Sequence, residues 1–428
     1  MGLPAGILMV WATATLGAIS NHYWLSVLAG LLCLGISLWA LYCSKVSQAL
    51  LLLGLTGAGL AWVQQDVSLI LGGLRSAATF VAFLASLYVL RGIIQTSPAL
   101  STVQSGLDGL PHRSQYGTMQ LLGFTFAVPL AVGAVGVIGP LVTRITEEAS
   151  REISAAWALR GMGLAVFFSP FTVAMGTVMN ALGERLALPL LLATGFITAS
   201  ICLTLPFMLG HCHFPTQLSR HFWQQTLRVF QPILLLVGAV LGLTYASHLS
   251  ALESIALSVP VLSFIIMAIR GPQAGRKIFE TAKNGWQNMS GEVTIFVAAM
   301  LFATALSSHP AVTEFFTQVA DKVGPGLLIT LTVLGVASMA MAGVHMLVTT
   351  TIFLTAFEPH MPGSVHLVML GMAGLIGWGF GSMVAPGSPA FLLATRIFMV
   401  RRQRMAFGMN MRFMLTIILL LCLLSNLV

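Results

Sequence analysis

Long apolar runs with almost no charge are the feature that most constrains how this chain can fold. Residues 23–43 (YWLSVLAGLLCLGISLWALYC) contain no acidic or basic side chain, and residues 405–427 contain only Arg412. At about 1.5 Å of rise per residue, a helix over either run can cross a hydrocarbon core of about 30 Å. Only 7% of the 428 residues are charged, whereas soluble domains have about 25%. The sequence therefore predicts an all-α polytopic membrane protein with the lipid bilayer as its surroundings.

The positive net charge does not indicate a nucleic-acid partner. The chain carries a net charge of +8, but its basic residues lie mostly in short turns between apolar runs, where membrane topology explains them. The five cysteines have no metal-ligand spacing. We therefore predict no nucleic-acid partner, no metal site and no cofactor.

Sequence motifs of enzymes are also missing. The chain has no P-loop, no HExxH and no pairing of a nucleophile with a base. A membrane enzyme such as a lipid-linked sugar polymerase usually carries a large loop with catalytic side chains. The longest loops expected here, 211–227 and 270–290, are short. We therefore predict that the chain is not an enzyme.

Hydropathy divides the chain into spans and two remaining apolar stretches. The expected spans, two of them interrupted, are residues 4–19, 23–43, 48–63, 74–92, 155–180, 186–209, 228–247, 251–269, 291–308, 364–400 and 405–427. The remaining stretches, 117–143 and 325–357, are broken by small residues near their middle, and we predict that they are re-entrant hairpins. The prediction is about eleven transmembrane helices plus two hairpins.

The distribution of positive charge agrees with this arrangement. With the N-terminus inside, the outer turns hold only Arg75, Arg185 and Lys322, and the cytoplasmic turns hold most of the other basic residues. This bias follows the positive-inside rule. We predict a multi-pass protein of a bacterial-type cytoplasmic (inner) membrane, with the N-terminus inside and the C-terminus outside.

Two halves of the chain correspond in the order of their segments. TFVA (79–82) matches IFVA (295–298), and SPFTVAMGTVMN (169–180) takes the place of GSMVAPGSPAF (381–391). The two hairpins enter from opposite sides in the predicted topology, as in inverted-repeat secondary transporters. The predicted domains are scaffold helices in 1–63, repeat 1 in 64–210 with hairpin 117–143 and broken helix 155–180, a cytoplasmic linker in 211–227, and repeat 2 in 228–428 with hairpin 325–357 and broken helix 364–400.

Paired hairpins followed by Gly/Pro-containing breaks resemble those of the ion transporter superfamily. This superfamily includes divalent-anion/sodium symporters, arsenite-efflux carriers, sodium/proton antiporters and the large subunits of TRAP transporters. The resemblance covers roughly residues 74–428 and implies an elevator-type carrier, commonly a homodimer. The chain departs from the family because neither hairpin holds an interior carboxylate, and because the Ser-Asn-Thr triplet of the dicarboxylate symporters is absent.

The interrupted helices carry the predicted binding site. A broken helix frees backbone groups in a medium without water, and such backbone persists only where it is buried in protein or lines a cavity. The N-termini of half-helices favour anions, whereas their C-termini and unwound carbonyls coordinate Na⁺. The candidate ligands for substrate or ion are Ser169, Thr172, Gly176, Thr177, Asn180, Gly136, Gly343, His345, Thr349, Thr350, Ser382, Gly387 and Ser388. Each hydroxyl has an alternative role, which is a bond to a carbonyl of its own helix.

His345 is the most informative single candidate. It lies in MAMAGVHMLVTTT, at the predicted tip of the second hairpin. An ionisable side chain at membrane depth is costly and is a functional hypothesis by default. The sequence leaves three roles open: binding an anion when protonated, coupling transport to protons, and a neutral bond across helices.

The leading functional hypothesis is a secondary active transporter of a small, carboxylate-like organic anion, coupled to Na⁺ or H⁺. One alternative is a cation/proton antiporter or metalloid exporter, for which Glu292 and Asp66 are the nearest intramembrane acids. The other is a TRAP-like permease subunit that needs an accessory binding protein.

Overall fold

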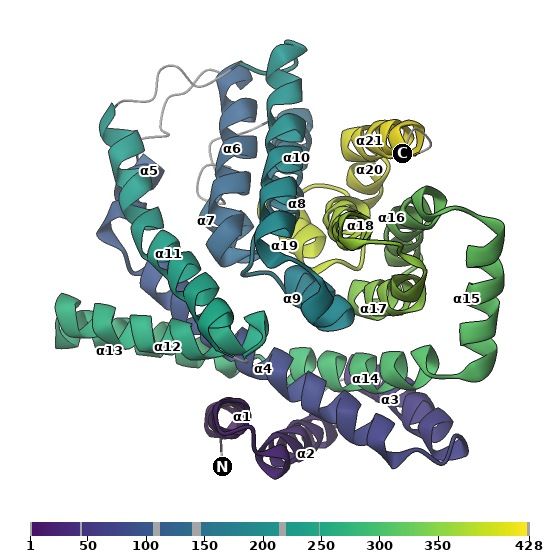
Figure 1. Cartoon of the computed structure of the whole chain (residues 1–428). Helices are drawn as coiled ribbons and strands as arrows, with labels where there is room; N and C mark the ends of the chain where they lie inside the picture. The colour runs from purple at the N-terminus through teal and green to yellow at the C-terminus, as the bar shows by residue number, and fades with distance from the viewer. Residues whose placement is uncertain are drawn as a thin grey trace. The chain divides into compact units, whose positions relative to one another are not determined.

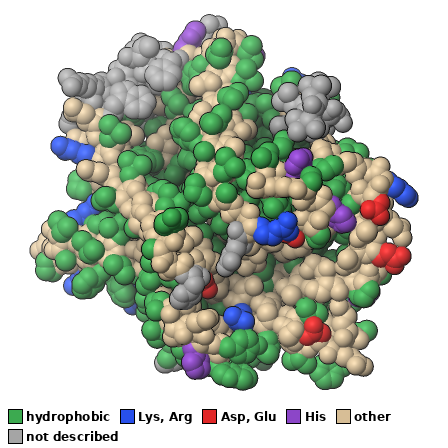
Figure 2. All heavy atoms as spheres, in the orientation of Figure 1, with side chains coloured by type: hydrophobic (Ala, Val, Ile, Leu, Met, Phe, Trp, Pro, Cys, Tyr) green, Lys and Arg blue, Asp and Glu red, His purple; other side chains and the backbone are tan. Residues whose placement is uncertain are grey.

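The computed structural model describes residues 2–42, 45–105, 112–138, 147–213, 220–247 and 249–425, and every regular element in these ranges is a helix. Seven of the helical segments are long and apolar enough to cross a membrane. Hydrophobic side chains are spread over the face drawn in Figure 2, where charged ones are few. These features fit an all-α membrane protein. Arg144, the end of hairpin 117–143 and the middle of linker 211–227 lie outside the described residues.

The chain divides into two compact units, each built from two separate segments. Unit 1 comprises Met1–Thr96 and Leu234–Gln318, and unit 2 comprises Ser97–Ile233 and Val319–Val428. The chain therefore passes between the units three times. This grouping cuts across the predicted repeats, because each repeat contributes residues to both units.

Unit 1 is a bundle around α4, the longest of its helices. Its helices are α1 (Leu3–Ile19), α2 (Tyr23–Ala40), α3 (Lys45–Val63), α4 (Val67–Gln95), α12 (Ala251–Arg270), α13 (Pro272–Trp286) and α14 (Ser290–Ser307), with the end of α11 (Arg220–Ala246) and most of α15 (Pro310–Lys322). Helices α1, α2, α12, α13 and α14 all pack against α4 (Figure 1). The segment 270–290, expected as a loop, instead forms α13.

A proline in α12 leaves a carbonyl free to accept hydrogen bonds from two other helices of unit 1. Pro260 lies inside α12 and has no N–H, so it cannot bond the carbonyl of Ala256 one turn earlier. That free carbonyl accepts a hydrogen bond from Trp11 Nε1 of α1 at 2.9 Å and another from Ser86 Oγ of α4 at 3.0 Å. The proline that removes one hydrogen bond within α12 thus allows two hydrogen bonds to other helices.

Small residues allow close helix contacts elsewhere in unit 1, as glycines do in membrane bundles generally. A Cβ at Gly57 of α3 would lie 2.5 Å from the Cα of Phe302 in α14, and one at Gly54 would lie 3.1 Å from the Cα of Ala298. The third glycine of this helix, Gly59, faces open space.

Unit 2 contains both predicted hairpins and both interrupted helices. Its helices are α5 (Pro98–Ser105), α6 (His112–Leu130), α7 (Gly133–Ile138), α8 (Glu148–Ala165), α9 (Val173–Leu182), α10 (Leu188–Met208), the start of α11, α16 (Pro325–Met341), α17 (Met346–Phe357), α18 (Ser364–Val384), α19 (Pro389–Phe398), α20 (Arg402–Ala406) and α21 (Met409–Ser425). Short 3₁₀ turns, Gly183–Arg185 and Glu358–His360, follow α9 and α17.

Helix–turn–helix segments and helix breaks occur within the stretches that the sequence singles out. Stretch 117–143 contains α6, a turn and α7, and stretch 325–357 contains α16, a turn and α17. Span 155–180 is divided into α8 and α9, and span 364–400 into α18 and α19. The first interrupted helix begins at Glu148, earlier than expected, because the polar turns of α8 before residue 155 carry no apolar signal.

The packing within unit 2 repeats itself. Helix α6 packs on α8, and α16 packs on α18. The second arm of each hairpin contacts the half-helix of the opposite half, with α7 on α19 and α17 on α9. An ion pair between Arg185 and Glu358 joins the turns that follow α9 and α17. Each half of unit 2 thus makes the same set of contacts.

The two interrupted helices cross at a pair of glycines. A Cβ on Gly379 of α18 would lie 2.5 Å from the carbonyl oxygen of Gly163 in α8, and a Cβ on Gly163 would lie 2.8 Å from that of Gly379. The two backbones are therefore in direct contact, which only glycine permits at both positions. No local sequence pattern indicates this crossing.

Candidate functional site

The first break covers residues 166–172, between α8 and α9, and its polar groups are bonded within the protein. Ser169 Oγ donates to the carbonyl of Val128 near the end of α6, at 2.6 Å. Ser169 Oγ also accepts the N–H of Phe171 at 3.3 Å. Carbonyls in the last turn of a helix have no partner inside the helix. Ser169 supplies that partner for Val128 and so links the first break to the end of α6, next to the turn of the first hairpin.

Thr172 completes the first break as the N-cap of α9. Its hydroxyl accepts the N–H of Met175 at 3.2 Å and donates to the carbonyl of Ser169 at 3.1 Å. Ser169 and Thr172 are both buried. A Thr N-cap typically stabilises a helix by about 1 kcal/mol. The hydroxyls of this break are therefore already used in hydrogen bonds that stabilise the fold.

The second break covers residues 385–388, between α18 and α19, and is less fully bonded. Ser388 is the N-cap of α19, yet its side chain makes no bond to the amides of that helix. Its hydroxyl donates only a long bond, 3.4 Å, to the carbonyl of Ser382. Gly387 is exposed, and no atom lies within 4 Å of the place that a Cβ would take. The start of α19 therefore opens onto free space.

The turn of the second hairpin lies against the end of α18. Gly343 has φ +91°, a conformation that favours glycine. A Cβ on Gly381 would lie 2.7 Å from Met346 Sδ, so the first residue of α17 touches α18 just before the break. Both hairpin turns are thus packed onto the interrupted helix of their own half.

His345 has a defined bond at this turn. It is the N-cap of α17, and its Nδ1 accepts the N–H of Leu347 at 3.2 Å. Its ring packs edge-on against Trp378 of α18, with 6.4 Å between ring centroids. An Nδ1 that accepts a backbone N–H carries no proton, so the geometry favours a neutral capping histidine with Nε2 as the remaining polar atom.

The other predicted hydroxyls differ in their surroundings. Thr177 and Thr349 donate to carbonyls one turn earlier in their own helices, at 2.8 and 3.3 Å, which is the local role. Thr350 Oγ1 is fully buried and has no partner among the described residues. Asn180 is exposed in the last turn of α9, about two turns beyond the break.

The remaining candidates are glycines and one serine. Gly176 is buried within α9, where its N–H bonds the carbonyl of Thr172 at 3.1 Å. Gly136 lies in α7, and Ser382 is buried in the last turn of α18. The structure therefore brings the hairpin turns and the breaks into one unit, while Asn180 lies apart from them.

A buried arginine in α8 received no role from the sequence. Arg160 is 5% exposed and lies between the rings of Trp157 and Phe413, at 4.4 and 4.3 Å from their centroids. Its Nε donates to Asn410 Oδ1 at 3.2 Å, while Asn410 Nδ2 donates to the carbonyl of Ala156 at 2.9 Å. The described residues give its guanidinium no carboxylate partner. An Arg inside predicted span 155–180 was the available signal, because charged side chains within spans are functional candidates.

The described carboxylates of unit 2 lie outside its core. None of those whose side chains the structure describes is buried: Glu147, Glu148, Glu152, Asp321 and Glu358. The two acids considered for a proton antiporter, Glu292 and Asp66, both belong to unit 1. Glu292 accepts from Tyr88 Oη at 3.2 Å. Asp66 is an exposed N-cap of α4, and the hydrogen bond from the Ser68 hydroxyl holds its pKa below the usual value.

In comparisons with known proteins, no protein-family model and no curated protein sequence matches the chain.

Proposed function

We propose that the chain is a secondary active transporter that carries a small organic anion through unit 2, coupled to Na⁺ or H⁺. The observation that carries the proposal is the repeated packing of two hairpins on two interrupted helices within this unit. Interrupted helices persist in a membrane where they are buried in protein or line a binding cavity. The ion transporter superfamily, which the sequence resembles, has this set of parts.

The charges of unit 2 favour an anion as the substrate. Arg160 is a buried cation with no carboxylate partner among the described residues, and no described carboxylate of this unit is buried. A buried unpaired charge is costly, and an anion nearby offsets part of that cost. The start of α19 adds the N–H groups of Ala390 and Phe391 and the positive end of a helix dipole, whereas Pro389 at its first position has no N–H.

The division into units supports an elevator-type movement. In this proposal unit 2 carries the substrate and unit 1 is the scaffold, joined by the three passages of the chain near residues 96, 233 and 318. Two of these passages lie at α5 and α15, which take corresponding places in the two halves. The proposed oligomer is a homodimer, which rests on the family resemblance.

A cation/proton antiporter or metalloid exporter is the second candidate. Such a carrier normally needs a titrating acid at its site, and the described part of unit 2 offers none that is buried. A TRAP-like permease subunit is the third candidate, and it would need a separate binding protein.

The deciding experiment is uptake into proteoliposomes that contain only the purified chain. Labelled monocarboxylates and dicarboxylates are offered under imposed Na⁺ and H⁺ gradients. We expect gradient-dependent uptake of at least one carboxylate. Cation/proton exchange without anion uptake would favour the antiporter instead, and uptake only after addition of a binding protein would favour the TRAP-like role.

A further inference from the structure

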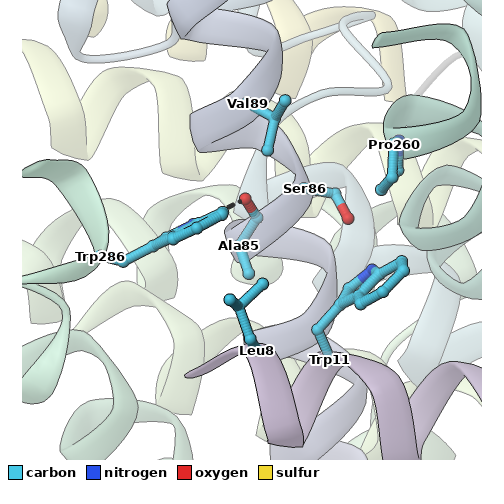
Figure 3. A pocket seen from close by; sticks show the side chains of 7 residues that line it. All are labelled: Leu8, Trp11, Ala85, Ser86, Val89, Pro260 and Trp286. Carbon is cyan, nitrogen blue, oxygen red and sulfur yellow. Dashed lines mark hydrogen bonds between the residues drawn. The ribbon is translucent and has the colours of Figure 1, made fainter. Parts of the chain in front are cut away.

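Unit 1 contains an apolar crevice that the transport proposal does not use. It has a volume of about 100 Å³, is partly open, and lies between α1, α4, α12 and α13. Its walls include Leu8, Trp11, Val89, Pro260 and Trp286, and Figure 3 shows the two tryptophans on either side of α4. An enclosed apolar cavity of about 150 Å³ binds a small hydrocarbon and stays dry, so a partly open crevice of this size fits a segment of a hydrocarbon chain.

The polar atoms beside the crevice are already bonded to the protein. Trp286 Nε1 donates to the carbonyl of Ala85 at 3.0 Å (Figure 3). Trp11 Nε1 and Ser86 Oγ donate to the carbonyl that Pro260 leaves free in α12. The crevice therefore offers apolar surface without a free hydrogen-bonding group, which suits a hydrocarbon chain and not a polar solute.

Helix α13, whose Trp286 lines the crevice, also has exposed basic side chains away from its buried stripe. Its residues Ile278, Ala282 and Trp286 are buried, one turn apart, so this stripe packs on α4. The exposed basic side chains are those of Arg276, Lys277 and Lys283. The only acid of the helix, Glu280, bonds Arg276 at 2.9 Å. Amphipathic helices with a basic polar face bind anionic lipid surfaces.

Helix α4 connects the crevice with the junction of α12 and α13, where Arg270 lies. Trp286 meets α4 at Ala85, and Ile278 lies against Gly92. Arg270, at the end of α12, donates from its guanidinium to the carbonyl of Ile93 at 3.0 Å. Along a helix, Ala85 and Ile93 are about 12 Å apart. One lipid can therefore place its headgroup near the cations and a chain in the crevice.

We propose that unit 1 binds one anionic phospholipid of the bilayer, with its headgroup on Arg276 and Lys277 beside Arg270 and a segment of an acyl chain in the crevice between Trp11 and Trp286. The net positive charge of α13 selects the headgroup, and the apolar walls hold the chain. Because the site belongs to unit 1, it is independent of the anion site proposed for unit 2.

The test measures binding of two lipids by the purified full chain in detergent, using native mass spectrometry. Dioleoyl phosphatidylglycerol and dioleoyl phosphatidylcholine have the same chains and differ in headgroup charge. We expect the anionic lipid to bind about tenfold more tightly. In the double variant Arg276→Gln, Lys277→Gln this preference should disappear. The matched control Arg402→Gln, Lys322→Gln removes the same charge from exposed positions of unit 2 and should retain it.

The crevice is tested by filling it from α1. Leu8→Trp should weaken binding of both lipids several-fold, about equally, because it occupies the space of the chain. Leu16→Trp lies on the same helix outside the crevice and is the control; the two leucines are 38% and 56% exposed. Melting temperatures without added lipid identify misfolding, in which case the milder Leu8→Phe replaces Leu8→Trp. Equal affinities for the two lipids, or a charge or crevice variant that behaves as its control does, would overturn the proposal.

Discussion

In the first break of unit 2, Ser169 and Thr172 bond the backbone that the break sets free, whereas in the second break Ser388 makes no bond to the helix that follows it. The first break is buried, and the second exposes Gly387 beside open space. Matching the starts of the two half-helices places Thr172 opposite Ser388, each as the N-cap.

This difference separates two roles that the sequence assigned to both breaks alike. Donors that are bonded inside the protein contribute to stability, whereas open donors can bind a ligand without first breaking a bond. We therefore expect substitutions in the second break to reduce transport, and substitutions in the first break to reduce stability.

Gly387→Val should have the largest effect. Nothing lies within 4 Å of the added Cβ, and the glycine is not among the residues with positive φ, so the backbone tolerates a side chain. The valine would occupy space that a ligand at the start of α19 needs, and uptake should fall at least about tenfold. The melting temperature in detergent should be unchanged.

The matched control for this variant is Gly324→Val. Gly324 is also an exposed glycine next to a helix start, with open space at its Cβ, but it precedes α16 far from the breaks in sequence. Equal uptake by the two variants would mean that the open start of α19 does not bind the substrate.

Ser388→Ala should reduce uptake about threefold to tenfold, because it removes a hydroxyl that lies beside the freed amides of α19. Its single bond, 3.4 Å long, contributes little to folding, so expression should be retained. Thr172→Ala is the matched change in the first break. It removes a capping bond and should lower the free energy of unfolding by about 1 kcal/mol with little change in uptake. The reverse pattern would contradict the assigned roles.

Two substitutions of His345 distinguish a role in capping α17 from a role in coupling transport to protons. His345→Ala removes the cap of α17 and should reduce uptake about threefold, because the hairpin turn is held less firmly. His345→Asn keeps an acceptor at the N-cap but has no titratable group, so it should restore most of the uptake. If His345→Asn instead abolishes the dependence on a proton gradient, the histidine couples transport to protons.

Much of the fold could be predicted because local sequence determines it. Apolar length located most of the long helices, and prolines next to glycine or serine, such as Pro170, Pro386 and Pro389, located the breaks, since proline removes a hydrogen bond from a helix interior. Helix α13 was missed because only one narrow stripe of it is apolar, and its polar face reads as a loop. The two units could not be predicted because each joins segments that are distant in sequence.

The candidate site was only partly predictable for the same reason. Hydroxyls near a break are visible in the sequence, but whether they are already bonded depends on partners such as Val128, which comes from another helix. Arg160 and Asn410 are 250 positions apart, so no local pattern connects them. Asn180 was included because it is polar and close to the break in sequence, yet the helical rise places it away from the break.

Ser169→Ala should have the smallest effect on uptake and a clear effect on stability. It leaves the carbonyl of Val128 without its 2.6 Å bond in a partly buried place, and such a loss costs about 1 kcal/mol. Chemical or thermal unfolding in detergent measures this loss, and proteoliposome uptake at a temperature well below the transition measures function. Ser307→Ala, which removes a local bond of 3.2 Å at the end of α14 in unit 1, is the control. Strongly reduced uptake at unchanged stability would show that the first break also holds the ligand, and the difference between the two breaks would then be one of bonding alone.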